Sequence, residues 1–218
     1  LPALRETGAR IVASIWGRSV DEYRQAAKQL QGGEGIVALE VNISCPNLEG
    51  RGEMFAHSSE LTRLAIRASA EANLPIWAKL SPNVTDISKI AFAAIESGAE
   101  ALTLSNTLMG MVIETSTRRP VLGNGGGGVS GPGVRPVAVR SVYEMREKLA
   151  DFPIIGVGGI SKPEHVIEFI AAGANAIQIG TAHFADPRAS KKVLKGLGKW
   201  CSKNKITNIS TLIGEAHG

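Results

Sequence analysis

Cysteine is scarce in this sequence of 218 residues, which contains Cys45 and Cys201 and no other thiol. Two cysteines cannot build the disulfide framework of a small secreted protein, so the composition predicts a reducing, cytoplasmic environment. The four histidines are scattered, and neither a His-x-x-x-His nor a Cys-x-x-Cys spacing occurs. The sequence therefore predicts that the protein holds no metal ion.

Long apolar runs and concentrated charge are also missing. No run of eighteen apolar residues occurs, so the sequence predicts no transmembrane helix. The net charge is +4, and the densest group of basic residues, Ser190–Lys205, is typical of a solvated helix face. We therefore expect no nucleic-acid partner and no membrane partner. A hydrophobic content of 44% is enough for one globular domain with a core.

The sequence does contain a regular alternation of short apolar runs and amphipathic segments. Six βα units are expected, with strands near residues 9–17, 36–44, 75–81, 101–106, 153–159 and 176–182. These runs are apolar on both faces, as in a parallel sheet that is covered by helices. The residues between 107 and 134 are expected to form a long irregular segment.

Polar residues predict where two of the helices begin and where one ends. Ser19 and Glu22 have the spacing of a capping box, and Gly32 with Gly33 should end the same helix. Ser161 and Glu164 predict a second cap, at the start of the helix within residues 162–173.

Two architectures fit this alternation, a (β/α)8 TIM barrel and a doubly wound sheet. Glycines follow the last two strands at 156–160 and 179–182, and barrels often bind phosphate with the loops after strands seven and eight. No Gly-x-Gly-x-x-Gly follows an early strand, which disfavours a Rossmann fold. We predict one α/β TIM-barrel domain over residues 1–218, with strands 3–8 present and two βα units upstream. Without those units, we expect these residues to fold poorly.

Barrel enzymes place their chemistry at the carboxyl ends of the strands, and polar residues gather there in this sequence. The candidates are Ser14, Asn42, Cys45, Asn47, Lys79, Ser105, Asn106, Thr107, Gly158, Gly159, Gly180 and Thr181. One thiol, one ammonium, several amides and hydroxyls, and two glycine turns predict a site for a planar polar ligand with a phosphate group.

Each of these features also has a purely structural interpretation. A lone cysteine is usually a small buried apolar residue, so Cys45 could be one too. Lys79 could pair with a carboxylate, and Gly158 with Gly159 could be no more than a tight turn. The stretch Gly123–Gly133 has seven glycines in eleven residues. It could be a flexible linker or a backbone that a ligand approaches closely.

Six segments occur in an order that resembles one family. They read "NISCPN", "KLSPNVTDI", "SNTLMGM", "GGVSGPGVRP", "IIGVGGI" and "IGTAHFADP". Together they resemble class 1 dihydroorotate dehydrogenase, the flavoenzyme of pyrimidine synthesis. The second and third segments look most like the 1B type, whose catalytic chain holds FMN. In that type a partner chain with FAD and an iron–sulfur cluster passes electrons to NAD, whereas the 1A type uses fumarate. The resemblance also implies a homodimer of catalytic chains.

The resemblance implies a role for each candidate residue. Cys45 stands where the family has its active-site base, at a position that is serine in class 2. Substrate contacts are implied for Asn42, Asn47, Asn106 and Thr107. FMN contacts are implied for Ser14, Asn42, Lys79, Ser105, Gly131, Gly158, Gly159, Gly180 and Thr181. Ser14 stands where many members have asparagine.

The expected reaction is the oxidation of (S)-dihydroorotate to orotate, in which C5 loses a proton and C6 passes a hydride to the flavin. A cysteine has a pKa of about 8.5 and needs only modest tuning to act as the base. Other functions remain open on the residues alone. They are another FMN barrel reductase of pyrimidines such as dihydropyrimidine dehydrogenase, a tRNA-acting dihydrouridine synthase, and an inactive truncated barrel that serves as a binding partner.

Overall fold

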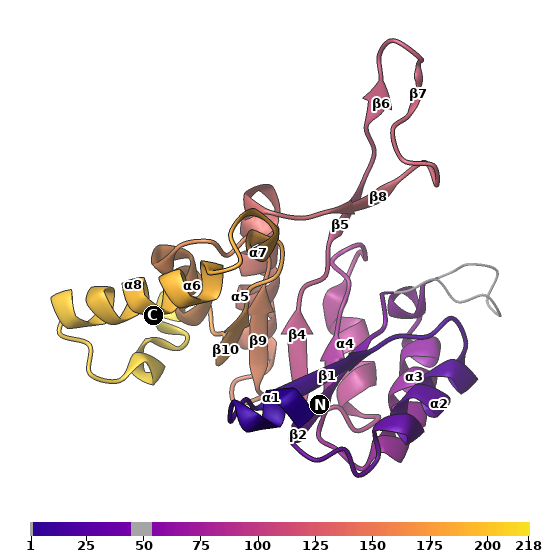
Figure 1. Cartoon of the computed structure of the whole chain (residues 1–218), viewed down its shortest axis with the longest axis horizontal. Helices are drawn as coiled ribbons and strands as arrows, with labels where there is room; N and C mark the ends of the chain where they lie inside the picture. The colour runs from indigo at the N-terminus through magenta and orange to yellow at the C-terminus, as the bar shows by residue number, and fades with distance from the viewer. Residues whose placement is uncertain (1, 45–53) are drawn as a thin grey trace. The chain divides into compact units, whose positions relative to one another are not determined.

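The computed structural model describes residues 2–44 and 54–218 of the chain. These residues divide into two compact units, whose elements can be followed by colour in Figure 1. The first unit comprises Leu1–Thr103 with Asp151–Pro153, and the second comprises Leu104–Ala150 with Ile154–Gly218. The prediction of one domain over residues 1–218 stays a prediction.

The first unit is built on parallel strands that follow one another in the order β1-β2-β3-β4. Its strands are β1 (Ile11–Ile15), β2 (Ile36–Asn42), β3 (Ile76–Lys79) and β4 (Ala101–Leu104). Its helices are α1 (Pro2–Glu6), α2 (Val20–Leu30), α3 (Ser59–Ser69) and α4 (Ile87–Ile95), with the short η1 (Phe55–His57) and η2 (Ala70–Ala72). Helices α2, α3 and α4 each lie between two successive strands, which confirms the alternation expected for this part of the chain.

Side-chain caps fix where the helices of the first unit begin. Ser19 caps α2 by accepting a hydrogen bond from the Glu22 N–H at 3.2 Å, as predicted. The Glu22 carboxylate accepts from the Arg18 N–H at 2.7 Å, so the second bond of the expected capping box goes to a neighbouring residue. Gly32 follows the C-cap residue Gln31 and has a φ of 71°, the left-handed conformation that a glycine allows at this position.

An aromatic pair in the core ties helix α2 to the carboxyl end of β2. The rings of Tyr23 and Phe55 are both fully buried and pack edge to face, with their centroids 5.1 Å apart. The Tyr23 hydroxyl donates a hydrogen bond to the Asn42 carbonyl at 2.7 Å. The backbone of one candidate site residue is therefore held by a side chain from a helix.

The second unit contains the parallel pair β9 (Ile154–Val157) and β10 (Ala176–Gln178). Its helices are α5 (Arg135–Lys148), α6 (Pro163–Ala171), α7 (Ala182–Ala185) and α8 (Ala189–Lys203), with the short η3 (Pro132–Val134), η4 (Ile209–Leu212) and η5 (Glu215–His217). Helix α6 begins one residue later than the predicted cap, because its N-cap is Lys162 and no side chain caps it. The prediction of a Ser161 cap is wrong, since Pro163 takes the first helical position, where proline is favoured.

One buried arginine links the end of α5 to the turns that enter β9 and β10. The guanidinium of Arg146 donates to the carbonyls of Gly173, Leu149 and Ala150 and to Oδ1 of Asn175, at 2.6–3.0 Å. The same Asn175 oxygen accepts from the Ile154 N–H at 2.9 Å. Arginine suits this position because its planar group carries five N–H donors in a fixed arrangement.

The segment that was expected to be irregular forms two antiparallel ribbons. Strand β5 (Leu108–Gly110) pairs with β8 (Gly127–Val129), and β6 (Ile113–Glu114) pairs with β7 (Arg119–Pro120) farther along the same projection (Figure 1). The prediction of an irregular segment is therefore wrong, and part of the glycine-rich stretch is a strand. We call residues 108–129 the ribbon. Seven large apolar side chains of the ribbon are 46–67% exposed, namely Met109, Met111, Val112, Ile113, Val121, Leu122 and Val129.

Candidate active site

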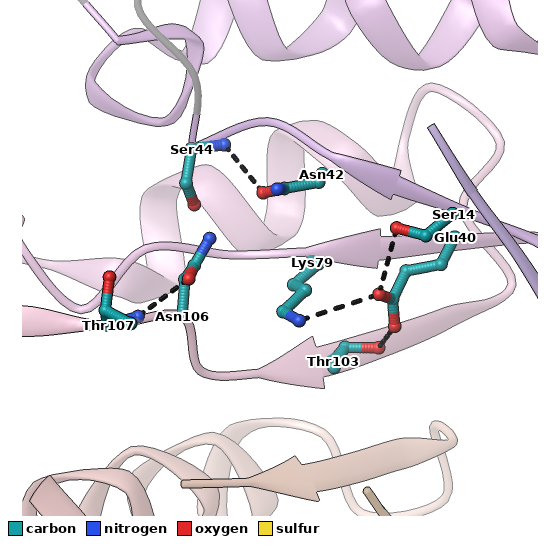
Figure 2. Close-up of polar contacts among 8 residues, drawn as sticks. All are labelled: Ser14, Glu40, Asn42, Ser44, Lys79, Thr103, Asn106 and Thr107. Atoms are coloured by element: carbon teal, nitrogen blue, oxygen red, sulfur yellow. Dashed lines mark hydrogen bonds and ion pairs between the residues drawn. The ribbon is translucent and has the colours of Figure 1, made fainter. Parts of the chain in front are cut away.

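Three predicted site residues of the first unit lie on neighbouring strands in register. Asn42 at the end of β2 pairs with Lys79 at the end of β3, and Lys79 pairs in turn with Thr103 of β4. Ser14 of β1 pairs with Glu40, two residues before Asn42. The structure therefore brings Ser14, Asn42 and Lys79 together, as Figure 2 shows.

Glu40 is a member of this group that the sequence analysis missed. The residue is 4% exposed and lies within an apolar strand. It accepts hydrogen bonds from Ser14 Oγ at 3.4 Å and from Thr103 Oγ1 at 3.0 Å, and it lies 3.7 Å from the Lys79 ammonium. A glutamate inside the run "IVALEVN" was the available signal, because a buried carboxylate needs partners.

Lys79 does have the carboxylate partner that its structural interpretation required. The distance from Lys79 Nζ to Glu40 Oε1 is longer than a hydrogen bond, and the Lys79 side chain is 21% exposed. Lys79 donates no hydrogen bond to any residue within 2–44 or 54–218. An ammonium carries three N–H donors, so the ion pair with Glu40 leaves Lys79 able to bind a ligand as well.

The side chain of Asn42 is fixed by its own loop. Its Oδ1 accepts a hydrogen bond from the Ser44 N–H at 3.2 Å. The Oγ of Ser44 is buried and has no hydrogen-bond partner in the part of the chain that the structure describes. A buried hydroxyl without a partner is unusual, and such a group is able to bond a ligand. Two predicted residues, Cys45 and Asn47, lie outside the described residues.

In the second unit, three consecutive predicted residues follow β4. The Ser105 N–H donates to the Val157 carbonyl at 3.1 Å, and the Thr107 N–H donates to Asn106 Oδ1 at 2.8 Å. The peptide bond between Leu104 and Ser105 is cis. These bonds fix the backbone of Ser105 and the side-chain amide of Asn106 at this strand end.

A glycine that the sequence analysis did not single out packs against Thr107. A Cβ atom at Gly128 would overlap the Thr107 hydroxyl, so only glycine lets β8 approach this closely. The run of four glycines at residues 125–128 was the signal for a close approach, but it did not tell which glycine makes it.

The predicted cofactor glycines fall into two groups. Gly158 and Gly159 have positive φ angles of 141° and 67°, and a Cβ at either position would collide with Ala138 or with the Gly131 carbonyl. These contacts support the interpretation as a tight, closely packed turn. Gly131 and Gly180 differ, because a Cβ built on either would meet no atom within 4 Å. Backbone of this kind is accessible to a ligand, and the exposed Thr181 directly follows Gly180.

A charged group lies beside the Gly158–Gly159 turn and was also missed. Arg135 pairs with Glu168 at 2.7 Å, and its Nη1 lies 2.8 Å from Nε2 of His165. Burial lowers the pKa of His165 below its ordinary value, and the Arg135 charge lowers that pKa further. The Glu168 carboxylate acts in the opposite direction, and the net shift of the His165 pKa is downward.

Residues 2–44 and 54–218 contain neither a metal centre nor a membrane-spanning helix. No group of three or more histidine, cysteine, aspartate or glutamate side chains is placed to hold a metal ion there. No helix of those ranges is long and apolar enough to cross a lipid bilayer.

The parallel strands alternate with helices, and polar residues lie at the strand ends. This combination is typical of an α/β-barrel enzyme. The description of the family model that matches residues 2–200 is dihydroorotate dehydrogenase. The chain belongs to the dihydroorotate dehydrogenase family. Members of this family are oxidoreductases that oxidise dihydroorotate in pyrimidine biosynthesis, so the predicted family and enzyme class are confirmed.

Two curated relatives and one solved structure illustrate the likeness. A protein of Desulforudis audaxviator, named dihydroorotate dehydrogenase B (NAD(+)), catalytic subunit, is 47% identical over 218 residues, which are 100% of this chain and 71% of that protein. A protein of Aquifex aeolicus, whose name assigns it provisionally to dihydroorotate dehydrogenase A (fumarate), is 42% identical over 99% of this chain and 71% of its own length.

The solved structure is that of dihydroorotate dehydrogenase from Eimeria tenella in complex with ferulenol. It matches with a TM-score of 0.72 at 23% identity, over 91% of this chain and 58% of that one. At this identity the match is informative about the fold alone. The predicted α/β-barrel fold is confirmed.

Proposed function

We propose that this protein binds FMN and oxidises (S)-dihydroorotate to orotate. The observation that carries the proposal is the Lys79 ammonium, which is mostly buried at a strand end and donates no hydrogen bond to the described residues. Such a cation suits a ligand that gains negative charge during the reaction. A cytoplasmic location is part of the same proposal.

The described residues fit FMN by the chemistry of their donors and by their open backbone. Lys79, the amide of Asn42 and the hydroxyl of Ser14 are polar groups of the kind that hold a flavin ring. The backbone at Gly131 and Gly180 is free of contacts that a ligand would have to displace. FMN, when bound, supplies the hydride acceptor.

The first unit would supply the charge and the proton acceptor. Lys79 stabilises negative charge on the ring that it contacts, and Asn42 with Asn47 orients the substrate ring by hydrogen bonds. Cys45 takes the proton from C5, because a base must lie within hydrogen-bond reach of that carbon. Ser14 adds a hydroxyl contact to the cofactor.

The second unit would supply amide contacts to the substrate and backbone contacts to the cofactor. Asn106 and Thr107 hold the ring and carboxylate of dihydroorotate, and Ser105 with Gly131 contacts FMN. The phosphate end of FMN is assigned to Gly158, Gly159, Gly180 and Thr181. Of these, Gly180 and Thr181 are the more accessible, because Gly158 and Gly159 are packed against neighbouring residues.

An electron-transfer partner belongs to this proposal. The Desulforudis audaxviator relative is named as a catalytic subunit, which supports a second chain with FAD and an iron–sulfur cluster. This chain has two cysteines and cannot supply four thiolates for a cluster. The 1A type, with fumarate as acceptor, is the alternative that the Aquifex aeolicus relative supports.

A homodimer is also proposed, and the ribbon is the surface that supports it. A two-stranded ribbon is marginally stable on its own in water, and a group of seven exposed apolar side chains in one segment is typical of an interaction surface. Glu114 and Arg119 lie opposite each other near its end, so two copies of the ribbon could pair with complementary charge. A charge in the ribbon, Val112→Asp, should shift the protein toward monomer in sedimentation velocity.

The test of the function is flavin content followed by turnover. The protein is saturated with FMN, and dihydroorotate oxidation is followed with an artificial electron acceptor, with NAD plus the partner chain, and with fumarate. Turnover with the artificial acceptor supports the proposal, and the other two arms separate the 1B from the 1A type. Absence of FMN binding would overturn it, and reduction of uracil in place of dihydroorotate oxidation would favour a dihydropyrimidine dehydrogenase.

A further inference from the structure

We infer that Glu40 is a positioning residue for Lys79, and that its buried carboxylate sets where the Lys79 ammonium lies. This inference rests on the proposed function, in which Lys79 contacts the flavin. Glu40 itself touches neither the substrate nor the cofactor in that proposal.

The position of Glu40 is fixed from three other strands. Its Oε1 lies 3.4 Å from Ser14 Oγ on β1 and 3.7 Å from Lys79 Nζ on β3, and its Oε2 accepts from Thr103 Oγ1 of β4 at 3.0 Å. Figure 2 shows the carboxylate between these three side chains. The two hydroxyls therefore orient the carboxylate, and the carboxylate faces the lysine.

The hydroxyls of Ser14 and Thr103 do not explain why residue 40 carries a negative charge. A glutamine could satisfy both hydroxyls, because its oxygen can accept from one and its NH2 group can donate to the other. A neutral side chain is also far less costly to bury than a carboxylate. A glutamate that is 4% exposed is tolerated where an opposite charge compensates its carboxylate, and Lys79 supplies that charge. The charge of Glu40 is thus matched to Lys79 and not to the hydroxyls.

The length of the ion pair fits a positioning role. At 3.7 Å the carboxylate attracts the ammonium without a hydrogen bond that would occupy one of its donors. Lys79 is restrained electrostatically and keeps its three N–H groups for a ligand. A closer, hydrogen-bonded pair would compete with the flavin for the same donors.

A purely structural role for Glu40 predicts different behaviour. In that case the carboxylate only satisfies Ser14 and Thr103, and its loss lowers the stability of the sheet without a specific effect on Lys79. Two measurements separate the roles, namely the chemical reactivity of the Lys79 amine in the protein without flavin, and a double-mutant cycle on FMN affinity.

The first measurement uses a water-soluble acetylating ester, with acetylation of Lys79 followed by mass spectrometry. The exposed Lys89 of the same unit is the internal reference. Glu40→Gln should raise the acetylation of Lys79 severalfold relative to Lys89, because the amine is no longer held by the buried charge. Thr103→Val should have a smaller effect in the same direction. Thr62→Val is the matched control, because Thr62 is equally buried and bonds to the Phe55 carbonyl instead.

The second measurement is the FMN dissociation constant of the protein, of Glu40→Gln, of Lys79→Met and of the double variant. Glu40→Gln should weaken FMN binding about tenfold, the usual scale for losing a hydrogen-bonded charged contact. In the Lys79→Met background the same change should weaken binding by less than about threefold, since the group that Glu40 positions is already gone.

The outcomes keep the inference and the proposed function apart. Equal weakening by Glu40→Gln in both backgrounds, with unchanged acetylation of Lys79, would overturn the positioning role. If the unaltered protein binds no FMN, the proposed function fails, and the acetylation ratio still decides whether Glu40 positions Lys79. A rise in acetylation that Thr62→Val reproduces would mean general loosening and would also overturn the inference.

Discussion

The candidate residues of the first unit and those of the second unit differ in how the structure holds them. Glu40, Lys79 and Thr103 are tied to one another across three strands, whereas Gly131 and Gly180 contribute open backbone. In the first unit, a substitution acts through the neighbours of the altered residue. In the second unit, a substitution acts mainly by adding atoms where a ligand or a neighbouring segment has to fit.

The largest expected effect is on the chemistry assigned to the first unit. Cys45→Ala should lower the rate of dihydroorotate oxidation by about 10²- to 10⁴-fold, the usual contribution of a general base. FMN binding should persist, because the thiol is assigned to the substrate. Cys45→Ser should keep a small activity with its pH profile moved upward, since a hydroxyl is a weaker base. Turnover by Cys45→Ala close to that of the unaltered protein would remove the assigned role.

The second effect tests whether the stability of the second unit depends on one side chain, that of Arg146. Arg146→Met should lower the free energy of unfolding by about 3 kcal/mol or more, because several buried carbonyls lose their donor. Urea denaturation measures the change. The control is Arg140→Met in the same helix, whose exposed i,i+4 pair with Glu144 should be worth at most about 0.5 kcal/mol. Similar losses for both variants would contradict the assignment.

The third effect concerns the open backbone of the second unit at Gly131. Gly131→Val should reduce FMN retention, because the side chain occupies space that we assign to the ligand. The φ of Gly131 is 92°, so valine also adds backbone strain of about 1–3 kcal/mol. Gly125→Val is the matched control, because Gly125 has a φ of 80° in the ribbon and its Cβ would meet only Met111 at 3.7 Å. Undiminished flavin content in the residue 131 variant would count against the contact.

The smallest effect concerns acid sensitivity in the second unit. Burial lowers the folded pKa of His165, so the unfolded chain binds more protons between that pKa and the ordinary value near 6.5. Stability should therefore fall as the pH drops through about 6.5 and level off below the folded pKa. His165→Gln should reduce this loss, as measured by urea denaturation at pH 7.5 and pH 5.5. An unchanged or larger loss in the variant would show that His165 is not its source.

The strands and several site residues could be predicted because their signals are local. Each apolar run of the first unit became a strand of the expected sheet, and the polar residues at its end point to the chemistry. Glu40 could not be placed in the same way, because Ser14 and Thr103 lie 26 and 63 residues away in the chain. No spacing rule connects residues that meet only through strand register.

Other features were missed because two local signals competed. The ribbon strands are two or three residues long, β5 and β8 contain glycine and β7 contains a proline, so their composition is that of a loop. At α6 the spacing of Ser161 and Glu164 suggests a cap, while Pro163 favours a later start, and the proline determines the outcome. The roles of Cys45 and Asn47 stay predictions.

The residue types that fit at position 146 depend on the residue at position 173. Gly173 has a φ of 116°, and a Cβ built there would fall 2.5 Å from Cγ of Arg146, so the arginine reaches its acceptors only while residue 173 has no side chain. A library that randomises residue 173 alone should return glycine after selection for folded protein. One that randomises both positions should also return pairs without arginine, in which a small residue at 173 accompanies a shorter side chain at 146. The two positions should therefore change together or not at all during evolutionary drift.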